Sequence, residues 1–199
     1  MVKIKDSLIE TQLKKERSDR NFLLIIAIML SVILAVLMVN TYVIFNVYVF
    51  GPSMQPTLQT GDVLIANRLK EPERGDVVIV SGAKVGSKDW LVKRVIAVGG
   101  ETVEIKDGYV FVQGNKLDFE PYVLENGVTH PAKERDSIFT VGENEFFYLG
   151  DNRENSSDSR NYGVCSKEQI VGVVSEWSLS NKKSITKFYN IISKFRLGG

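Results

Sequence analysis

The sequence is poor in the residues on which metal sites and most catalytic triads depend. Among 199 residues there is one cysteine, Cys165, and one histidine, His130. One cysteine excludes a disulfide scaffold and a cysteine-cluster zinc site within one chain, and one histidine disfavours a Ser-His-Asp triad. We expect Cys165 to be a small buried side chain and His130 to lie on the surface. Any chemistry must therefore run mostly on other groups.

One stretch of the chain has no charged residue, and in the rest the acidic and basic residues are concentrated in different segments. No charged residue lies between Asn21 and Gly61, and residues 51–180 carry a net charge of −6. Both ends are basic, with +2 over residues 1–20 and +5 over residues 181–199. The acidic body argues against nucleic acid as a partner. The basic ends indicate contact with membrane lipid.

An apolar run of 18 positions extends from Phe22 to Val39, with Ser31 as its only polar residue. As a helix it would be about 27 Å long, close to the thickness of a bilayer core. A buried core helix is disfavoured because the run is apolar on every face. A cleaved signal peptide is disfavoured because the run is too long and lacks a small-x-small site. We predict a transmembrane anchor over 21–41, broken at Asn40-Thr41.

The positions of lysine and arginine predict the orientation of this anchor. Basic residues precede it closely, and the first one after it is Arg68. The positive-inside rule then places the segment 1–20 in the cytoplasm and the body outside. We therefore expect a single-pass protein of the cytoplasmic membrane with an extracytoplasmic domain over 42–180.

Short β-like runs separated by turn signals dominate that domain. They are Tyr42–Phe50, Val63–Ala66, Asp76–Val80, Trp90–Val98, Thr102–Ile105, Tyr109–Gln113, Glu145–Leu149 and Ile170–Leu179. The runs on either side of Asp107-Gly108 predict a hairpin. Residues Leu117 to Thr140 are more polar and predict a long excursion between strands. The fold class expected is mainly β, a closed or partly open antiparallel sheet assembly with one N-terminal transmembrane helix.

The C-terminal segment 181–199 has a different pattern. Ile185, Phe188, Ile192 and Phe195 recur at helical spacing, with lysines between them. This pattern predicts a basic amphipathic helix. It fits a helix packed on the body and also a helix lying on anionic lipid, and the sequence leaves both open.

Three polar segments are candidates for chemistry. Gly51-Pro52-Ser53 follows a predicted strand, and such a turn could present the Ser53 hydroxyl to a substrate. On the strand 90–98, Lys93 shares a face with Leu91, Val95 and Ala97, whereas Arg94 lies on the other face. An amine among apolar side chains either reaches water or has a lowered pKa that suits a general base. The segment 150–160 is dense in short polar side chains. It predicts either a solvated loop or a buried network that orients a catalytic amine, with Asp158 and Arg160 paired as support.

These segments together resemble a known family. GPSMQPTL, LVKRVIAVGG and GDNRENSSDSR, with GDVLIA and RGDVVIV between them, are similar to the signature segments of bacterial type I signal peptidases. Those are membrane-anchored Ser/Lys proteases, and the short insert and single anchor resemble the Gram-positive form. The resemblance implies a serine endopeptidase that removes signal peptides from secreted preproteins at small-x-small sites, with no metal and no cofactor.

The resemblance also implies a role for each matching position. Ser53 would be the nucleophile, Lys93 the general base, and Ser156 would hold the Lys93 amine by a hydrogen bond. Asp158 and Arg160 would form a supporting ion pair. The Ser53 amide would donate to the oxyanion, and Gly51 stands where some members place a second, hydroxyl donor. The candidate substrate-binding residues are Val49, Gly51, Met54, Leu58 and Val92.

One alternative from a different class remains. A non-catalytic, membrane-anchored β-module that binds extended peptides would share the anchor and the strands. It would require Ser53 and Lys93 to lie far apart, or Lys93 to be charged and solvated.

Overall fold

The structure, a computed structural model, describes residues 2–85, 89–117, 123, 129–130 and 138–197. For residues 2–13, 40, 84–85 and 194–197 it describes the backbone alone. The chain divides into two compact units, Met1–Val43 and Ile44–Gly199. Most of the predicted excursion between Leu117 and Thr140 lies outside the described residues.

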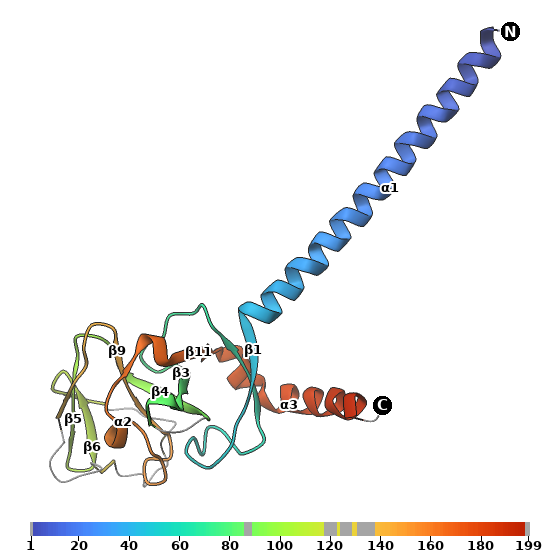
Figure 1. Cartoon of the computed structure of the whole chain (residues 1–199). Helices are drawn as coiled ribbons and strands as arrows, with labels where there is room; N and C mark the ends of the chain where they lie inside the picture. Colours follow the sequence, from blue (N-terminus) through green and yellow to red (C-terminus); the bar gives the residue numbers. More distant parts are fainter. Residues whose placement is uncertain (1, 86–88, 118–122, 124–128, 131–137, 198–199) are drawn as a thin grey trace. The chain divides into compact units, whose positions relative to one another are not determined.

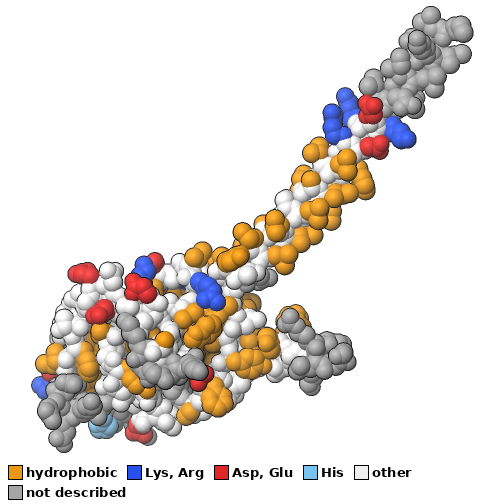
Figure 2. Space-filling view, viewed as in Figure 1, with side chains coloured by type: hydrophobic (Ala, Val, Ile, Leu, Met, Phe, Trp, Pro, Cys, Tyr) orange, Lys and Arg blue, Asp and Glu red, His pale blue; other side chains and the backbone are white. Residues whose placement is uncertain are grey.

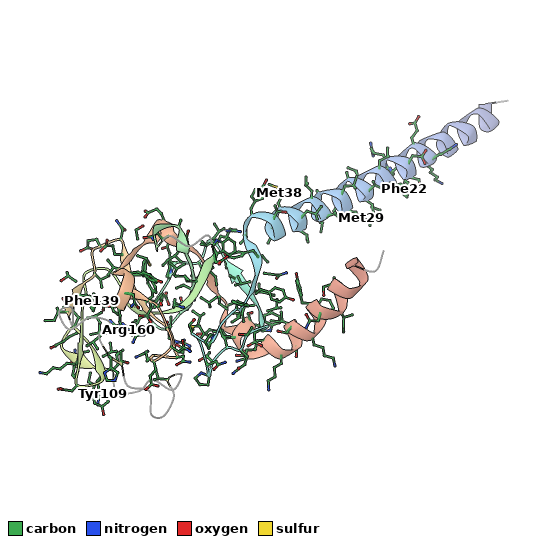
Figure 3. All side chains as sticks on the ribbon, turned by 60° about the horizontal axis from the view of Figure 1, so that its bottom comes forward. Phe22, Met29, Met38, Tyr109, Phe139 and Arg160 are labelled. Atoms are coloured by element: carbon green, nitrogen blue, oxygen red, sulfur yellow. The ribbon has the colours of Figure 1, made fainter. Side chains whose placement is uncertain are left out.

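The first unit is one helix, α1 (Val2–Tyr42) (Figure 1). Its stretch Lys14–Val39 is long and apolar enough to cross a membrane, and apolar side chains surround it on the visible face in Figure 2. In Figure 3 Phe22, Met29 and Met38 point outward from the helix. The hydroxyls of Ser31 and Thr41 donate to the carbonyls of Ile28 and Leu37, both at 2.8 Å. These two hydroxyls are thus satisfied within the helix, as a lipid environment requires.

The second unit is built on two antiparallel sheets. The larger sheet contains, in spatial order, β1 (Ile44–Tyr48), β2 (Val63–Asn67), β11 (Ile170–Val174), β3 (Val77–Ser81), β4 (Trp90–Ala97), β9 (Glu145–Leu149) and β10 (Cys165–Ser166). The smaller sheet contains β7 (Asn115–Lys116), β6 (Tyr109–Val112), β5 (Thr102–Lys106) and β8 (Ile138–Thr140). The mainly β prediction is confirmed. In the described part of the chain neither strand order closes on itself, so the partly open form of the prediction is the one found.

The predicted hairpin is present. β5 pairs with β6 from Lys106 opposite Tyr109 to Val103 opposite Val112. Its turn residues Asp107 and Gly108 have φ of 52° and 83°. A two-residue turn with both φ angles positive matches the twist of antiparallel strands, which is why Asp-Gly favours it.

The large sheet curls so that strands distant in the pairing order meet. β1 and β4 are separated by three strands, yet the Phe45 and Trp90 rings lie edge to face at 5.4 Å between centroids. β9 pairs with β4 only from Arg94 onward, opposite Leu149. Among the described residues, the β4 edge from Trp90 to Lys93 therefore has no strand partner on that side. Two strand edges, those of β1 and β4, are available near each other.

The last strand is shorter than predicted. β11 ends at Val174 instead of continuing to Leu179, and helix α3 (Glu176–Leu197) begins directly after it. The Ser175 hydroxyl accepts the Ser178 N–H at 3.2 Å, and the Ser175 carbonyl accepts the Leu179 N–H. Ser175 is therefore an N-cap. The cap starts a helix where the sequence predicted that the strand would continue to Leu179.

Apolar side chains fill the space beneath the strands in three buried clusters. One joins β1, β2 and β3 with Met54 and Leu58, and another joins the two sheets through Val103, Ile105 and Phe147. Cys165 is 1% exposed in the third cluster and His130 is exposed, so both predictions are confirmed.

Candidate active site

The loop that carries Ser53 connects β1 to β2 and is pinned by the core. Met54 and Leu58 are 1% and 0% exposed and pack in the first apolar cluster, whereas Ser53 stays partly exposed. Backbone hydrogen bonds from Gln55 N to Pro52 O and from Leu58 N to Met54 O tighten the turn. Burial on the far side thus fixes the serine with its hydroxyl directed toward β4.

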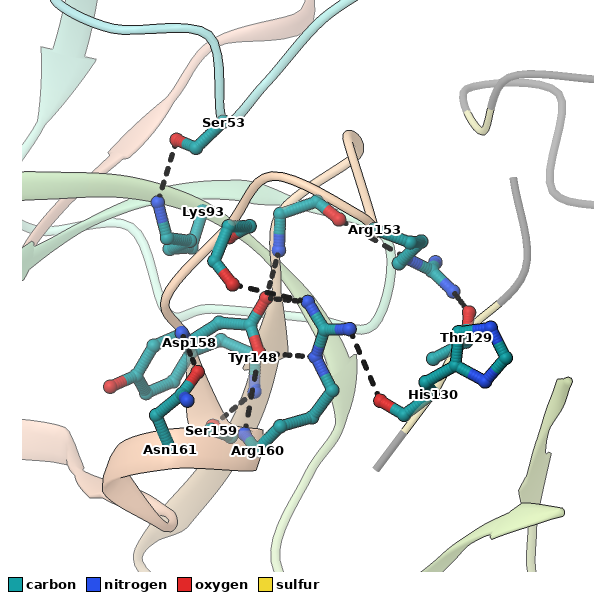
Figure 4. A network of polar contacts seen from close by, with 12 residues as sticks. Ser53, Lys93, Thr129, His130, Tyr148, Arg153, Asp158, Ser159, Arg160 and Asn161 are labelled. Carbon is teal, nitrogen blue, oxygen red and sulfur yellow. Dashed lines mark hydrogen bonds and ion pairs between the residues drawn. The ribbon is translucent and has the colours of Figure 1, made fainter. Parts of the chain in front are cut away.

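Lys93 on β4 meets this hydroxyl. Its Nζ lies 2.8 Å from Ser53 Oγ and 3.0 Å from the Val92 carbonyl (Figure 4). Lys93 is 3% exposed. Desolvation by burial lowers its pKa from 10.5 to about 8, although Asp158 and Asp151 act in the opposite direction. An amine with this pKa is substantially neutral at mildly alkaline pH and can accept a proton.

The alternation of side chains along β4 explains the placement of Lys93, with one correction. Leu91 and Val95, two residues to either side, pack in the same apolar cluster. A bulge interrupts the pairing with β9 between Val95 and Ala97, and Ala97 joins a different cluster. The prediction that Ala97 shares the face of Lys93 is therefore wrong, because a bulge shifts the alternation by one residue.

Asp158 and Arg160 form a buried ion pair. The Arg160 Nε and Nη2 atoms donate to Asp158 Oδ1 and Oδ2, both at 2.8 Å, and the side chains are 6% and 0% exposed. Asp158 also caps the short helix α2 (Ser159–Tyr162) and accepts the Gly150 N–H at 3.0 Å. One carboxylate thus fixes the end of β9, the start of α2 and the arginine (Figure 4).

Ser156 does not make the bond predicted for it. Its Oγ is buried and has no hydrogen-bond partner in the described part of the chain, while Lys93 Nζ bonds to Ser53 Oγ and the Val92 carbonyl. Ser156 packs instead against Gly150, where a Cβ would overlap both Ser156 Oγ and the Ser53 carbonyl. The glycine allows the two loops to approach closely.

A second polar network lies on the opposite face of β4 and was missed from the sequence. Arg94 Nε and Nη2 donate to the two carboxylate oxygens of Asp151 at 2.8 and 2.7 Å. The Thr57 hydroxyl donates to the same carboxylate at 2.5 Å. Asp151 is 1% exposed. This carboxylate ties the serine loop to the strand that carries Lys93. Alternation along β4 placed Arg94 on that face, but nothing local identifies its partner.

Asn152 joins the same two loops through the backbone. Its N–H donates to the Ser53 carbonyl at 3.0 Å, and its Nδ2 donates to the Pro52 carbonyl at 3.2 Å. The polar segment 150–160 therefore supports the serine loop, which excludes a merely solvated loop. Within the described residues it makes no hydrogen bond to the Lys93 amine, so its predicted role in orienting that amine is not seen in this structure.

A groove of about 680 Å³ lies between β1 and β4, along edges that have no strand partner in the described part of the chain. It is lined by Asn46, Val47, Tyr48, Phe50, Asp89, Trp90 and Leu91. Of the predicted substrate-binding residues, Val49, Met54 and Leu58 are buried in the core at 3%, 1% and 0% exposure. In this structure they support the serine loop from beneath. Gly51 and Val92 are partly exposed, and their contact with substrate stays a prediction.

Within the described residues, no group of three or more His, Cys, Asp and Glu side chains is placed to hold a metal ion. Burial raises the pKa of Tyr148, which lies beside this site, so its phenol stays protonated. Lys93 is the described group whose pKa is moved toward neutrality.

A serine hydroxyl bonded to a desolvated lysine has the geometry that a nucleophile and an adjacent base require. The family model for "Signal peptidase, peptidase S26" matches residues 22–178, which include Ser53, Lys93 and the 150–160 segment. The chain belongs to this family, and it is an enzyme of the type I signal peptidase class.

Three relatives with signal peptidase names match 73–82% of this chain. The chain is 38% identical over 159 residues to signal peptidase I S of Bacillus subtilis, covering 73% of this chain and 82% of that one. It is 40% identical over 159 residues to a signal peptidase I of Bacillus amyloliquefaciens, covering 73% and 79%. A probable signal peptidase I-2 of Synechocystis is 32% identical over 172 residues, covering 82% and 76%. A crystal structure of signal peptidase I from Enterococcus faecalis, 28% identical, superposes with a TM-score of 0.43 over 53% of this chain and 98% of that one.

Proposed function

We propose that this signal peptidase removes signal peptides from secreted preproteins by acyl transfer, with Ser53 as nucleophile and neutral Lys93 as general base. The observation that carries the proposal is the 2.8 Å separation between Ser53 Oγ and a lysine amine that is 3% exposed. A hydroxyl becomes a competent nucleophile when an adjacent base within hydrogen-bond distance takes its proton.

In the acylation step, Ser53 Oγ attacks the scissile carbonyl as its proton passes to Lys93 Nζ. The C–N bond of the tetrahedral intermediate then breaks, and the Lys93 ammonium gives the proton to the leaving amine. The products are the mature protein, with a new amino terminus, and a signal peptide esterified to Ser53.

Deacylation uses the same amine. Lys93, neutral again, takes a proton from a water molecule that attacks the ester carbonyl. The ester C–O bond breaks, the proton returns to Ser53 Oγ, and the signal peptide leaves with a free carboxyl end. Each step begins with Lys93 unprotonated, which its lowered pKa of about 8 makes accessible. About half of the molecules are then in the active form at pH 8 and about a tenth at pH 7.

The Ser53 N–H is available as the oxyanion donor, because it has no acceptor among the described residues. Gly51, two residues earlier, has φ of 84° and nothing within 4 Å of its Cβ direction. A second donor from this position would have to be the backbone or a bound water, since glycine has no hydroxyl. Loss of one oxyanion donor costs roughly a hundredfold or more in rate.

The preprotein would bind as an extended strand in the groove between β1 and β4. Its main chain would pair with the free edges of both strands, which is the β-augmentation mode of peptide recognition. Gly51 and Val92 lie partly exposed near Ser53 and would contact the small residues at positions −3 and −1.

α1 would anchor this site at the outer face of the cytoplasmic membrane. The exposed basic residues Lys14, Lys15, Arg17 and Arg20 precede the apolar stretch, and the first basic residue after it is Arg68. The positive-inside rule places the N-terminus in the cytoplasm. Membrane anchoring brings the enzyme to the surface where signal peptides emerge.

The experiment is cleavage of a preprotein with an Ala-x-Ala site by the full chain in detergent. Wild type is expected to cut at that site, and Ser53→Ala and Lys93→Ala are expected to be inactive. The matched controls are Ser180→Ala and Lys106→Ala, which remove the same groups at exposed positions and are expected to cut like wild type.

Continued cleavage by either site variant would show that a different catalytic pair is at work. Absence of cleavage by the wild type, together with retained binding of the preprotein, would favour the non-catalytic peptide-binding module. The 2.8 Å contact and the lowered pKa of Lys93 already weigh against that module, since it requires a distant or solvated lysine.

A further inference from the structure

The first half of α3 is fastened to the sheet by hydroxyl groups. β11 pairs with β2 only at Asn67 and Ala66, which leaves the earlier β2 amides without a strand partner on that side. The Ser178 hydroxyl accepts the Ile65 N–H at 2.7 Å, and the Thr186 hydroxyl accepts the Val63 N–H at 2.9 Å. α3 therefore covers this β2 edge, and its orientation on the body is fixed.

A different side of α3 exposes large apolar residues. Trp177 and Phe188 are 62% and 66% exposed, and Ile191 and Ile192 are 47% and 48% exposed. At 100° per residue these four positions fall within one sector of the helix, beside the sector of Ser178 and Thr186 that meets β2. Tyr189 and Asn190 still meet Tyr48 of β1, through an edge-to-face ring contact at 5.3 Å between centroids and a hydrogen bond from the Tyr48 hydroxyl to Asn190 Oδ1 at 3.4 Å. The end of α3 extends beyond the sheets in Figures 1 and 3. The stripe is therefore an apolar surface with no cover among the described residues of the body.

The charges on α3 have one sign. After Glu176 the sequence has no acidic residue, but it contains Lys182, Lys183, Lys187, Lys194 and Arg196. Lys183 and Lys187 are exposed, whereas Lys182 turns to the body and donates to the Thr57 carbonyl at 2.5 Å. A hollow of about 500 Å³ is lined by Asp62, Lys183, Thr186, Lys187, Asn190 and Ile191. Two ammonium groups and an isoleucine thus border one opening, with a single carboxylate.

We propose that α3 is an interfacial helix that lies on an anionic lipid surface, with Trp177, Phe188, Ile191 and Ile192 in the acyl boundary and lipid phosphates at Lys183 and Lys187. Apolar aromatic residues beside lysines are the composition of helices that bind in the plane of a membrane. Lysine stems can follow the apolar surface while the ammonium groups reach the headgroups. α1 keeps the chain at a membrane whether or not Ser53 is the nucleophile, so the proposal is independent of the catalytic mechanism.

The experiment uses the full chain in nanodiscs that hold one copy each. Trp90→Phe leaves Trp177 as the only tryptophan, and brominated lipid quenches tryptophan on contact. We expect Trp177 to be quenched in discs of phosphatidylglycerol and phosphatidylcholine, and much less in phosphatidylcholine alone. In the Trp90→Phe background, Lys183→Glu/Lys187→Glu should lower the ratio of lipid-contacting to free Trp177 roughly tenfold or more.

The matched control is Lys106→Glu/Lys116→Glu, which makes the same charge change at exposed positions of the small sheet. It should leave the quenching unchanged. Equal quenching in both lipid compositions, or no effect of Lys183→Glu/Lys187→Glu, would overturn the anionic-lipid assignment. A Trp177 that lipid does not quench would overturn the whole proposal. If Trp177 is then shielded from acrylamide only in discs with two copies, the stripe is a contact between copies.

Discussion

Lys93 and Arg94 are neighbours on one strand, both cationic by type and both buried, yet their surroundings differ completely. Arg94, 7% exposed, makes two hydrogen bonds to the Asp151 carboxylate. Lys93, 3% exposed, donates to a hydroxyl and a carbonyl and makes no hydrogen bond to a carboxylate among the described residues, and desolvation lowers its pKa to about 8. A buried cation that is paired with a carboxylate stays charged and holds two parts of the structure together. A buried amine that lacks such a partner has a lowered pKa and loses its proton more easily. The alternation of a β-strand is enough to separate the two roles.

The largest expected effect follows from removing the amine or its partner. Lys93→Ala and Ser53→Ala should each lower kcat for preprotein cleavage by about 10⁴-fold or more, as for other nucleophile–base pairs. Lys93→Arg should be equally inactive, because a guanidinium does not become neutral at accessible pH. Single-turnover cleavage assays check this. Measurable activity of Lys93→Arg above the Lys93→Ala level would argue that charge, rather than proton acceptance, is what the site needs.

Breaking the other pair should chiefly affect stability. Asp151→Ala leaves Arg94 buried without its carboxylate and Thr57 without its acceptor, and should lower the free energy of unfolding by about 3–5 kcal/mol. The double variant Arg94→Met/Asp151→Leu removes both charges and should lie much closer to wild type. Denaturant unfolding in detergent measures both. If the double variant is as unstable as Asp151→Ala, the lost stability comes from losing the ion pair itself and not from leaving Arg94 charged and unpaired.

Removing the Lys93 amine should raise the free energy of unfolding, whereas Asp151→Ala lowers it. A pKa lowered from 10.5 to about 8 means that folding disfavours the ammonium form, by up to about 3 kcal/mol. The penalty is fully present below pH 8 and fades between pH 8 and 10.5, as the unfolded chain also loses its proton. Lys93→Met should therefore unfold at higher denaturant than wild type at pH 7, with the gap closing toward pH 10.5. A gap that does not depend on pH would point to packing instead.

The smallest expected effects are on stability, and they differ in sign between Ser156→Ala and Ser178→Ala. Ser156 Oγ is buried without a partner among the described residues, whereas the Ser178 hydroxyl accepts the Ile65 N–H. Ser156→Ala should leave stability unchanged or raise it by about 1 kcal/mol, and Ser178→Ala should lower it by about 1 kcal/mol. Thermal unfolding compares them directly. If Ser156→Ala proves destabilising and also reduces cleavage, a bond to Lys93 must form when substrate is bound.

Local patterns predicted much of the fold. Turn chemistry at Asp107-Gly108 predicted the β5–β6 hairpin, and alternation placed Lys93 and Arg94 on opposite faces. The limits of the last strand were wrong, because a single capping serine, Ser175, stops it at Val174.

The prediction of the candidate site depended on the combination of the three polar segments and not on any one of them. The structure brings Ser53 and Lys93 together as that combination implied. The contact between Arg94 and Asp151 joins positions 57 residues apart, and no local signal identifies such a partner. Met54 and Leu58 were expected to line a pocket, but the loop between β1 and β2 packs them into the core. Tertiary packing, which a linear pattern does not contain, decides both.

The central claim is that burial makes Lys93 neutral near pH 8. The direct measurement is an NMR titration of the full chain labelled with ¹³C at lysine Cε, with Lys93→Ala used to assign the Lys93 signal. We predict a midpoint at about pH 8, matched by a rise in kcat/KM with the same midpoint. A midpoint near 10.5, the ordinary lysine value, would contradict the account, because the amine would then be charged wherever the enzyme works.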